Sequence, residues 1–324
     1  MIDTVLFRHV CNAPCLDSFT QLGDKFVFNP PPVKGYARPH LTWYLAPDGV
    51  GYLDAKVSLP KMLFGNNVQM ISDADITRGL DTVTGFVSEV AGVEFNAWTA
   101  PLGRLDVCHN WHVGEAETYM YLHALRNAHL PRMVRRVIDT GTVDFINGSQ
   151  KVVFYSKHAE TIKRAQEGKA TDEQLRASIG VLRGERRFIN TPACKRLAAS
   201  LSVDSHRAEH LLTRDVAEAV MSNTVKELGL DSRIESTDSR LALLREHYGF
   251  GKTYETLAGF LQLCDIHGAD NLVRLGYHPE TFRRRRKEVE AAGAWLTNPT
   301  RATLPPLRLV RGNVAAQRAA VGLG

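Results

Sequence analysis

The chain has 324 residues, of which 44% are hydrophobic, so it is long and apolar enough to form one large domain or two medium ones. Its formal charge of +5 makes it mildly basic, which is compatible with a nucleic-acid partner without requiring one. The five scattered cysteines argue against a disulfide framework, no run approaches the ~20 apolar residues that span a bilayer, and the opening MIDTVLFRHV lacks the features of a signal peptide. We therefore expect a soluble, cytoplasmic protein with no membrane partner.

The N-terminal part of the chain predicts strands and one long helix. Residues 2–7 (IDTVLF) form a run typical of a strand, and the proline- and glycine-rich residues 11–40 are typical of a loop. Two apolar runs flank the turn-forming APDGVG and predict a hairpin over 41–59. Residues 72–92 have apolar positions at helical spacing, a capping residue at the start and a glycine at the end, and predict a helix.

The alternation continues up to residue 190. The further predicted elements are a strand over 100–113, a helix over 114–128, a hairpin over 142–157, short helices over 158–170 and 171–178, and a strand over 179–189 that Gly184 breaks. The hairpin is centred on an Asn-Gly pair, the strongest short hairpin signal. This order predicts an α+β fold, in which a mostly antiparallel sheet with packed helices precedes a smaller, all-helical C-terminal region.

Four regions are expected along the chain. They are an α+β domain over 1–200, a helical connector over 201–237, a helical DNA-binding region over 238–296, and a loosely ordered tail over 297–324. Breaks near His267-Gly268 and Gly276–Pro279 leave room for a helix-turn-helix in the third region.

Polar side chains occupy alternate positions in four predicted strands, so each strand has one polar face. The sets are Asp54, Lys56 and Ser58; Arg104 and Asp106; Tyr155 and Lys157; and Arg183, Glu185 and Arg187. Such alternation is typical of half-exposed antiparallel strands. If the four faces belong to one sheet, however, they bring carboxylates and cations beside a single tyrosine.

That combination has a chemical use. A tyrosine oxygen can attack a phosphodiester and hold the cut end covalently. Carboxylates can bind a divalent ion that polarises a phosphoryl oxygen, and lysine or arginine can stabilise the charge on phosphorus. A cation such as Lys157 near Tyr155 would favour the phenolate.

Several blocks, in order, resemble the replication initiation proteins of filamentous phages, the gene II protein family with its C-terminal gene X portion. The blocks are the opening MID, LDAKVSLPKMLFGNNV (53–68), GRLDVCHN (103–110), VVFYSKHAE (152–160), VLRGERRF (181–188) and the helical tail up to FRRRRKEVEAAG. The most specific are the Tyr–x–Lys–His block and the Lys–x–Leu–x–Gly–x–Asn block.

The resemblance implies a rolling-circle initiator. Members of the family nick one strand of the double-stranded phage genome at its origin with a tyrosine that keeps the 5′-phosphate, and later rejoin the displaced strand. Carried onto this chain, the nucleophile is Tyr155, with Lys157 and His158 beside it in the catalytic site. The implied partners are double- and single-stranded DNA at the phage origin, a host helicase and a host DNA polymerase, all in the cytoplasm of the host cell.

A divalent metal ion, Mg²⁺ or Mn²⁺, is the implied cofactor. Many rolling-circle initiators hold it with a His–apolar–His pair, which this sequence lacks, so we predict acidic ligands: Asp106 and Glu185 first, and Asp54 third. The alternative for Asp106 and Glu185 is a structural ion pair with the arginines beside them.

The residues predicted to contact DNA or its phosphates share a positive charge. They are Lys56, Lys61, Arg104, Arg183, Arg187, Arg283, Arg284, Arg285 and Arg286. For the run 283–286 a solvated helix face is the alternative. For the whole chain the alternative is a non-enzymatic, sequence-specific DNA-binding protein or repressor with a helix-turn-helix-like C-terminal region. The sequence leaves open whether Tyr119 or Tyr121 takes part in rejoining.

Overall fold

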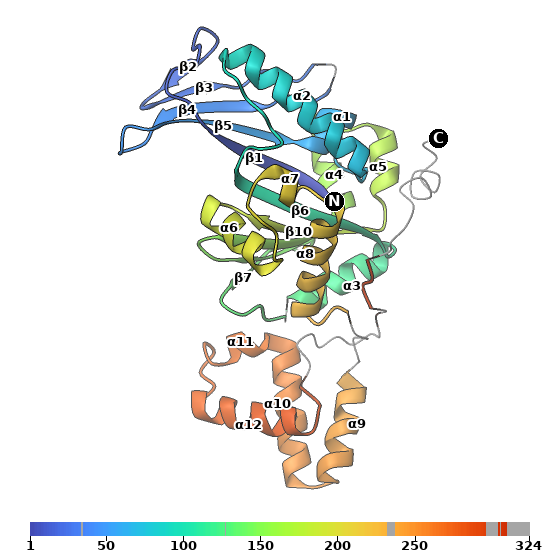
Figure 1. Ribbon diagram of the computed structural model, residues 1–324. Coiled ribbons are helices and arrows are strands. Elements are labelled where there is room, and N and C mark those ends of the chain that lie inside the picture. Colours follow the sequence, from blue (N-terminus) through green and yellow to red (C-terminus); the bar gives the residue numbers. More distant parts are fainter. Residues whose placement is uncertain (34, 127, 232–236, 296–303, 305, 310–324) are drawn as a thin grey trace.

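A computed structural model describes residues 1–33, 35–126, 128–231, 237–295, 304 and 306–309 (Figure 1). Within these residues the chain forms one ten-stranded sheet, in which every strand pairing is antiparallel, together with packed helices. The expected α+β class with a mostly antiparallel sheet is therefore confirmed. In the described part of the chain, no helix combines the length and apolar character needed to cross a bilayer.

The strands follow the sheet order β2-β3-β4-β5-β1-β6-β10-β9-β8-β7. Their bounds are β1 Ile2–Val10, β2 Thr20–Leu22, β3 Lys25–Phe28, β4 His40–Leu45, β5 Gly51–Ser58, β6 Leu102–His112, β7 Val134–Asp139, β8 Thr142–Ile146, β9 Gln150–Ser156 and β10 Val181–Phe188. The helices are α1 Leu59–Phe64, α2 Asp73–Ala91, α3 Glu115–Leu125, α4 Lys157–Gln166, α5 Asp172–Ser178, α6 Thr191–Ser200, α7 Ala208–Leu211, α8 Arg214–Glu227, α9 Thr237–Tyr248, α10 Lys252–His267, α11 Ala269–Leu272 and α12 Pro279–Ala291.

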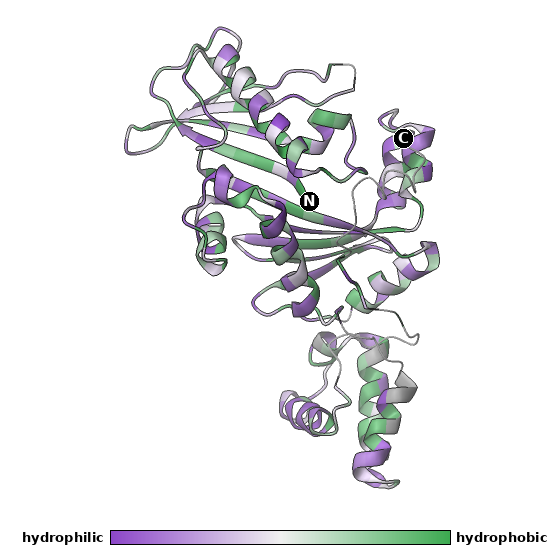
Figure 2. Cartoon of the chain, turned by 45° about the vertical axis from the view of Figure 1, so that its right-hand side comes forward, coloured by the Kyte–Doolittle hydropathy of each residue, from purple (hydrophilic) through white to green (hydrophobic). Residues whose placement is uncertain are grey.

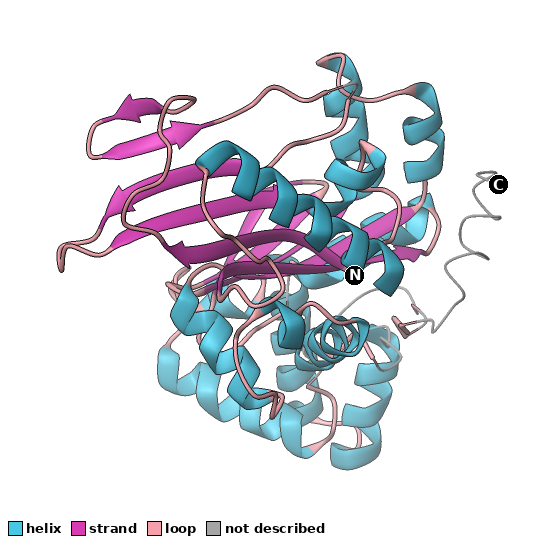
Figure 3. Cartoon of the chain, turned by 45° about the horizontal axis from the view of Figure 1, so that its top comes forward, coloured by secondary structure: helices cyan, strands magenta, loops and turns pink. Residues whose placement is uncertain are grey.

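One face of the sheet is apolar and forms the main core. Its buried side chains include Val5, Phe7, Leu53, Leu105, Val107, Val152 and Phe154. Helices α2, α6 and α8 lie over this face (Figure 1), and Figure 3 shows α2 running along the strands of the N-terminal half. Because successive residues of a strand point to opposite faces, the polar residues between these apolar ones all lie on the other face.

The ends of α2 match the sequence prediction. Ser72 caps the helix, and its side chain and that of Asp75 exchange hydrogen bonds with each other's backbone N–H. Gly92 ends the helix in the left-handed conformation, where glycine carries no Cβ penalty. Ile76, Leu80 and others at helical spacing are buried against the sheet. Local chemistry therefore fixes both the length and the buried face of this helix.

Three strands at the edges of the sheet, or next to an edge, were missed: β2 and β7 are the edge strands, and β3 lies between β2 and β4. The short strands β2 and β3 fall in the expected loop over 11–40, and they bury no side chain fully. Strand β7, at the opposite edge, leaves Val134, Val137 and Ile138 exposed and has a register shift between Val137 and Asp139. Edge strands need not alternate between polar and apolar residues, so they give little sequence signal.

Gly184 lies inside β10 and does not break it, contrary to the prediction. It pairs with His109 on one side and with Phe154 on the other. The rings of Phe154 and Trp111 stack across it with centroids 6.0 Å apart. A Cβ at this position would lie 2.7 Å from the Phe154 ring and 2.8 Å from the Trp111 ring, so glycine provides space for the two rings.

The helices α9–α12 have a hydrophobic cluster of their own. Its buried members are Leu244, Leu257, Phe260, Leu261, Cys264, Leu272, Val289 and Ala294. Figure 2 shows these helices apart from the sheet, with apolar residues concentrated on α10, and the apolar side chains pack against one another in this cluster. Helix α10 ends at His267 and helix α12 begins at Pro279, and these two positions coincide with the two predicted breaks.

Within the segment expected to be a helical connector, 201–237, helix α8 packs on the sheet. Helix α8 buries Val216, Val220 and Met221 in the main core. Leu307 also belongs to this core, and its N–H donates to the carbonyl of Leu230. Most of the expected loose tail, 297–324, lies outside the described residues.

The Gly184 packing can be tested by adding one methyl group. We expect Gly184→Ala to lower the free energy of unfolding by roughly 1–3 kcal/mol, because two packed rings must move. The control is Gly85→Ala in the middle of α2, where nothing lies within 4 Å of the new methyl group. This substitution should raise stability by about 0.5–1 kcal/mol. Urea unfolding measures both, and equal effects of the two substitutions would contradict the packing account.

Candidate active site

Apart from Lys157, the residues of the four polar strand faces predicted from the sequence lie on one face of one sheet. Arg183 lies between Asn110 of β6 and Tyr155 of β9, and Arg187 lies between Asp106 of β6 and Lys151 of β9. Residues directly opposite each other point to the same side. The register therefore confirms the shared face and brings the tyrosine, acids and cations together.

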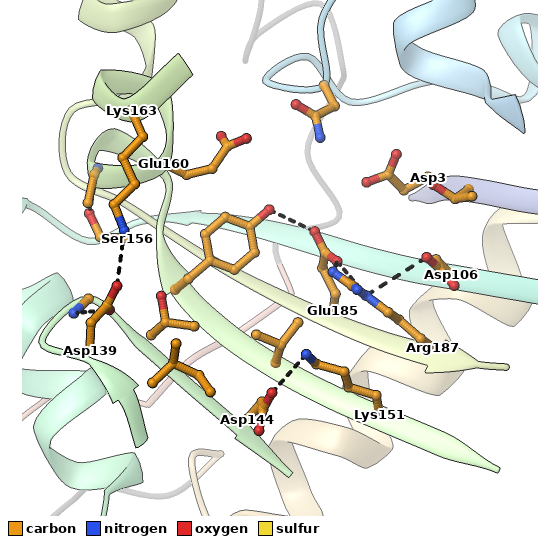
Figure 4. Close-up of a pocket in the computed structure, with 18 of the residues that line it drawn as sticks. Asp3, Asp106, Asp139, Asp144, Lys151, Ser156, Glu160, Lys163, Glu185 and Arg187 are labelled. Carbon is orange, nitrogen blue, oxygen red and sulfur yellow. Dashed lines mark hydrogen bonds and ion pairs between the residues drawn. The ribbon is translucent and has the colours of Figure 1, made fainter. Parts of the chain in front are cut away.

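This face is hollowed into a cleft of about 660 Å³. The cleft is lined by the hydroxyl-bearing side chain of Tyr155 and by charged residues of both signs, shown in part in Figure 4. The cations are Lys56, Lys61, Arg104, Arg136, Lys151, Lys163 and Arg187, and the acids are Asp3, Asp106, Asp139, Asp144, Glu160 and Glu185. Such a cleft can bind an anionic substrate only through cations that are not already neutralised by these acids.

The phenol of Tyr155 is held by a carboxylate. Its hydroxyl donates to Glu185 Oε1 at 2.7 Å. Burial and the negative charge of Glu185 raise the pKa of Tyr155 well above its ordinary value, although Arg183 acts in the opposite direction. The tyrosine is therefore a neutral phenol in the resting site, and the expectation that a nearby cation favours the phenolate is wrong.

Lys157 does not lie on the strand as predicted. Strand β9 ends at Ser156, whose hydroxyl caps α4, so Lys157 is the first helical residue. Its ammonium donates to Asn67 Oδ1 and to Glu160 Oε2, both at 2.8 Å, and lies 5.9 Å from the centre of the Tyr155 ring. The side chain is fully buried, and burial and the nearby Arg183 lower its pKa to about 8.

Arg183 lies beneath the cleft with 0% of its surface exposed, although the sequence predicted a phosphate contact for it. Its guanidinium donates to Glu185 Oε1 at 2.8 Å, to the carbonyl of Asn67 at 2.8 Å and to Asn110 Oδ1 at 3.1 Å. It also donates to Asp3 and to the sulfur of Cys108. These acceptors use the donors of Arg183, so it positions the site and is not free to contact a ligand.

Two further arginines bind the acids at the floor of the cleft. Arg104 donates to both oxygens of Asp106, at 2.8 and 2.7 Å, and Arg187 donates to Glu185 Oε2 at 2.6 Å. Glu185, Arg187 and Asp106 lie side by side in Figure 4. Burial opposes the ionisation of Glu185, but Arg183 and Arg187 outweigh it and lower its pKa to about 2. Glu185 is therefore an ionised acceptor for the phenol.

The predicted metal ligands do not fit a metal ion in this arrangement. Asp106 uses both oxygens for Arg104, Glu185 is shared by two arginines and Tyr155, and Asp54 binds Arg8 with both oxygens outside the cleft. Among the residues that the structure describes, no group of three His, Cys, Asp or Glu side chains is placed to hold a metal. The ion-pair alternative describes these carboxylates as they stand.

Lys56 and Lys61 are the cleft cations best placed to receive an anion. Neither ammonium forms a hydrogen bond or ion pair within the described part of the chain, whereas Arg104, Arg136, Lys151 and Lys163 each bind an acid. Lys56 is exposed at the edge of the cleft, where partial desolvation of its ammonium and the neighbouring Arg104 lower its pKa. An anionic group in the cleft would therefore meet these two lysines first.

Other predicted site residues lie away from the cleft. The ring of His158 is hydrogen-bonded to Ser178 Oγ at 3.0 Å and does not line the cleft. The predicted arginine run on α12 is also elsewhere: Arg283 binds Glu280 at 2.6 Å and Arg286 binds Glu290 at 2.7 Å. The other two members of the run, Arg284 and Arg285, have Glu288 and Tyr277 as partners. These pairs match the solvated helix face given as the alternative.

Sequence reasoning missed two residues that hold the site together. Asp3 binds Arg183 and accepts from the Ser58 hydroxyl at 2.8 Å, and Asn67 binds both Lys157 and Arg183. Both lie in blocks quoted for the resemblance, the opening MID and the Gly–x–Asn end of the second block. That location was the available signal, since spacing alone does not show which strands these residues approach.

The two other tyrosines considered for rejoining differ in position. Tyr119 of α3 is 42% exposed and lines the same cleft as Tyr155. Tyr121 is completely buried in the main core. Only Tyr119 of these two can therefore reach a substrate in the cleft.

Comparison with known proteins adds no assignment. No protein-family model matches the chain, and a search of curated proteins gives no match.

The role of Glu185 in holding the site predicts a large effect on stability. Glu185→Gln leaves Arg183 and Arg187 without the charge between them, so we expect a loss of roughly 3–5 kcal/mol in the free energy of unfolding at neutral pH. The control is Asp139→Asn, whose partner Lys163 is largely exposed, and it should change stability by less than about 1 kcal/mol. Urea unfolding at pH 7 compares the two.

The pH dependence of stability, compared between the wild type and Glu185→Gln, tests the lowered pKa of Glu185. A carboxylate with a folded pKa near 2 stabilises the protein above its unfolded pKa, and this contribution is lost as the pH falls toward 2. The wild type should therefore lose stability more steeply than Glu185→Gln between about pH 4.5 and pH 2. Parallel acid limbs for the two proteins would contradict the assignment.

Proposed function

We propose that this chain is a DNA nicking and joining enzyme that starts rolling-circle replication, with Tyr155 as the nucleophile. One observation carries the proposal. The hydroxyl of the partly exposed Tyr155 donates a hydrogen bond to an ionised carboxylate inside a cleft that also presents two ammonium groups, those of Lys56 and Lys61, which have no ion-pair partner among the described residues. A nucleophile with a hydrogen-bonded acceptor and cations for the developing charge are the parts that phosphodiester transfer needs.

The chemical step balances when solvent protons are included. The Tyr155 oxygen forms a bond to phosphorus while the bond from phosphorus to the 3′-oxygen breaks. The phenolic proton passes to the Glu185 carboxylate and from there to solvent, and the leaving 3′-oxygen takes up a proton from solvent water to give a free 3′-hydroxyl. Because the pKa of Tyr155 is raised and that of Glu185 is low, this proton moves only as the new bond removes the basicity of the phenol oxygen.

The two products of this step, the phosphotyrosine and the free 3′-hydroxyl, are the species that the later steps of the proposed replication cycle need. The 5′-phosphate stays on Tyr155, so its bond energy is kept for rejoining by the reverse reaction. In this proposal the free 3′-hydroxyl at the phage origin primes a host DNA polymerase, and a host helicase unwinds the duplex. Lys157 and Arg183 act by holding Glu160, Asn67 and Glu185 in place, not by touching the phosphate.

No part of the proposed step is assigned to the divalent metal that the resemblance implies, because its expected ligands Asp106 and Glu185 are bound to arginines. Nicking assayed with EDTA, and then with added Mg²⁺ or Mn²⁺, tests that expectation separately from the role of Tyr155.

We propose that the helices α9–α12 add DNA affinity outside the cleft. Their separate hydrophobic cluster supports a distinct binding unit, although the α12 arginines are paired with neighbours as described. A non-enzymatic DNA-binding protein is the alternative. It differs in one measurable respect, because it forms no covalent product with DNA.

The nucleophile is tested by removing one oxygen. We expect Tyr155→Phe to lose nicking and the covalent adduct while keeping DNA binding, because the ring stays and only the attacking atom is lost. The control is Tyr119→Phe, which changes a tyrosine of the same cleft and should still nick. Denaturing gels with an origin oligonucleotide detect the adduct, and peptide mapping locates it. Nicking by the Tyr155→Phe variant would refute the assignment.

The two unpaired lysines are predicted to bind the reacting phosphate. We expect Lys56→Ala with Lys61→Ala to slow nicking on the order of 10²-fold, because charge on phosphorus is no longer stabilised. Lys163→Ala is the control, since its ammonium lines the same cleft but is bound to Asp139 at 3.0 Å. Single-turnover rates compare the variants. An equal loss in all of them would show a general charge effect in place of a specific one.

A further inference from the structure

The polar face of the sheet continues beyond the cleft, across β1, β3, β4 and β5. Tyr44 lies directly opposite Tyr52, and Arg8 lies opposite Asp54. Tyr52, Asp54 and Lys56 alternate along β5 and so share a face. Lys56 is also a lining residue of the Tyr155 cleft. One unbroken surface therefore joins two aromatic rings to the proposed nicking site.

The two rings and two cations hold one another in fixed positions. The Tyr44 and Tyr52 rings stack with centroids 5.8 Å apart and 29° between their planes. The Arg8 guanidinium lies 5.6 Å from the Tyr52 ring and 5.9 Å from the Tyr44 ring, and Lys25 Nζ lies 5.8 Å from the Tyr44 ring. Asp54 fixes Arg8 through both oxygens, at 2.8 and 2.7 Å. The rings thus have a defined orientation before any ligand arrives.

These rings are not part of the core. Tyr44 and Tyr52 are half-buried, whereas the residues next to them in the same strands, Trp43 and Leu53, are buried on the apolar face. Cross-strand tyrosine pairs also stabilise sheets, so ring packing by itself does not reveal a ligand. The cations arranged around the rings are the feature that sheet stability does not require.

The chemistry of this surface suits one class of ligand. Aromatic faces stack on unpaired bases, and neighbouring cations neutralise the phosphates that link them. Lys25 and Lys56 have no ion-pair partner in the described ranges of the chain, so their charge is available. In a duplex the bases are already stacked and paired, whereas a single strand presents them to an aromatic surface.

The geometry also connects this surface to the cleft. Tyr52 and Lys56 are four residues apart in one strand, which is roughly 13 Å at 3.3 Å per residue. That is the scale of about two nucleotides of an extended single strand. A strand lying with its bases on the tyrosines would therefore reach Lys56, and with it the cleft, without turning away from the sheet.

We propose that the face of Tyr44, Tyr52, Arg8 and Lys25 is a binding track for single-stranded DNA that guides a strand into the Tyr155 cleft. The claim that this track leads to the Tyr155 cleft rests on the proposed function, but the claim that it binds single-stranded DNA does not. Bases stack on the two rings, Lys25 contacts phosphate, and Arg8 with Asp54 keeps the rings in place.

Binding of a fluorescein-labelled oligo-dT by the Tyr155→Phe protein, measured by fluorescence anisotropy, tests the track without cleavage. We expect Tyr44→Ala and Tyr52→Ala each to weaken binding roughly fivefold or more, because a stacked base loses its ring. The matched controls Tyr44→Phe and Tyr52→Phe keep the ring and should bind within about twofold of the parent, as expected if stacking supplies the affinity. Unchanged binding by the alanine variants, or an equal loss in the phenylalanine variants, would overturn the proposal.

A second measurement does not depend on the folding of any variant. Photo-crosslinking of a bromodeoxyuridine-substituted single strand to the unaltered protein, followed by peptide mapping, should label peptides from β4 and β5. Crosslinks confined to other peptides would overturn the track. Binding and crosslinking at this face without any covalent adduct at Tyr155 would keep the track and defeat the nicking proposal, so the two failures are distinguishable.

Discussion

The cleft depends on one buried charge, the guanidinium of Arg183. It binds acceptors from strand β1, from the loop after α1, from β6 and from β10, and none of its surface is exposed. A buried cation costs several kcal/mol unless its donors are satisfied, so these four segments can pack only when they meet around it. The ion-pair network is therefore a condition for closing the centre of the sheet, and the cleft is built on top of it.

The same guanidinium sets the chemistry of the tyrosine. Because Arg183 and Arg187 keep Glu185 ionised, Glu185 accepts the hydrogen bond of Tyr155 and holds it as a neutral phenol. A neutral phenol is a weak nucleophile in the absence of substrate, and this protects the site from side reactions. In the proposed reaction, the phenol would attack only when a phosphate is placed against it and its proton can leave toward Glu185. Stability and reactivity thus rest on the same carboxylate.

Much of this arrangement could be predicted from the sequence, because strand periodicity reports which side chains share a face. It placed Asp106, Tyr155 and Glu185 together, and cap residues such as Ser72 located α2. Periodicity does not show how deeply a side chain is buried, however, so Arg183 was expected at the surface. It also does not report where a strand ends, and Lys157 was placed on β9 although Ser156 already caps a helix. Contacts made across the fold leave no local pattern, and the edge strands show only a weak one.

The polar face carries two kinds of cation. The arginines at the floor of the cleft are held by acids: Arg104 donates to both oxygens of Asp106, and Arg187 donates twice to one oxygen of Glu185, so these planar groups shape the site and are already engaged. On this face, the cations that have no ion-pair partner among the described residues are lysines: Lys56 and Lys61 in the cleft, and Lys25 in the proposed binding track. An incoming strand would therefore be held by exposed ammonium groups, whose attraction salt weakens, while the buried arginine network that positions Tyr155 is screened far less.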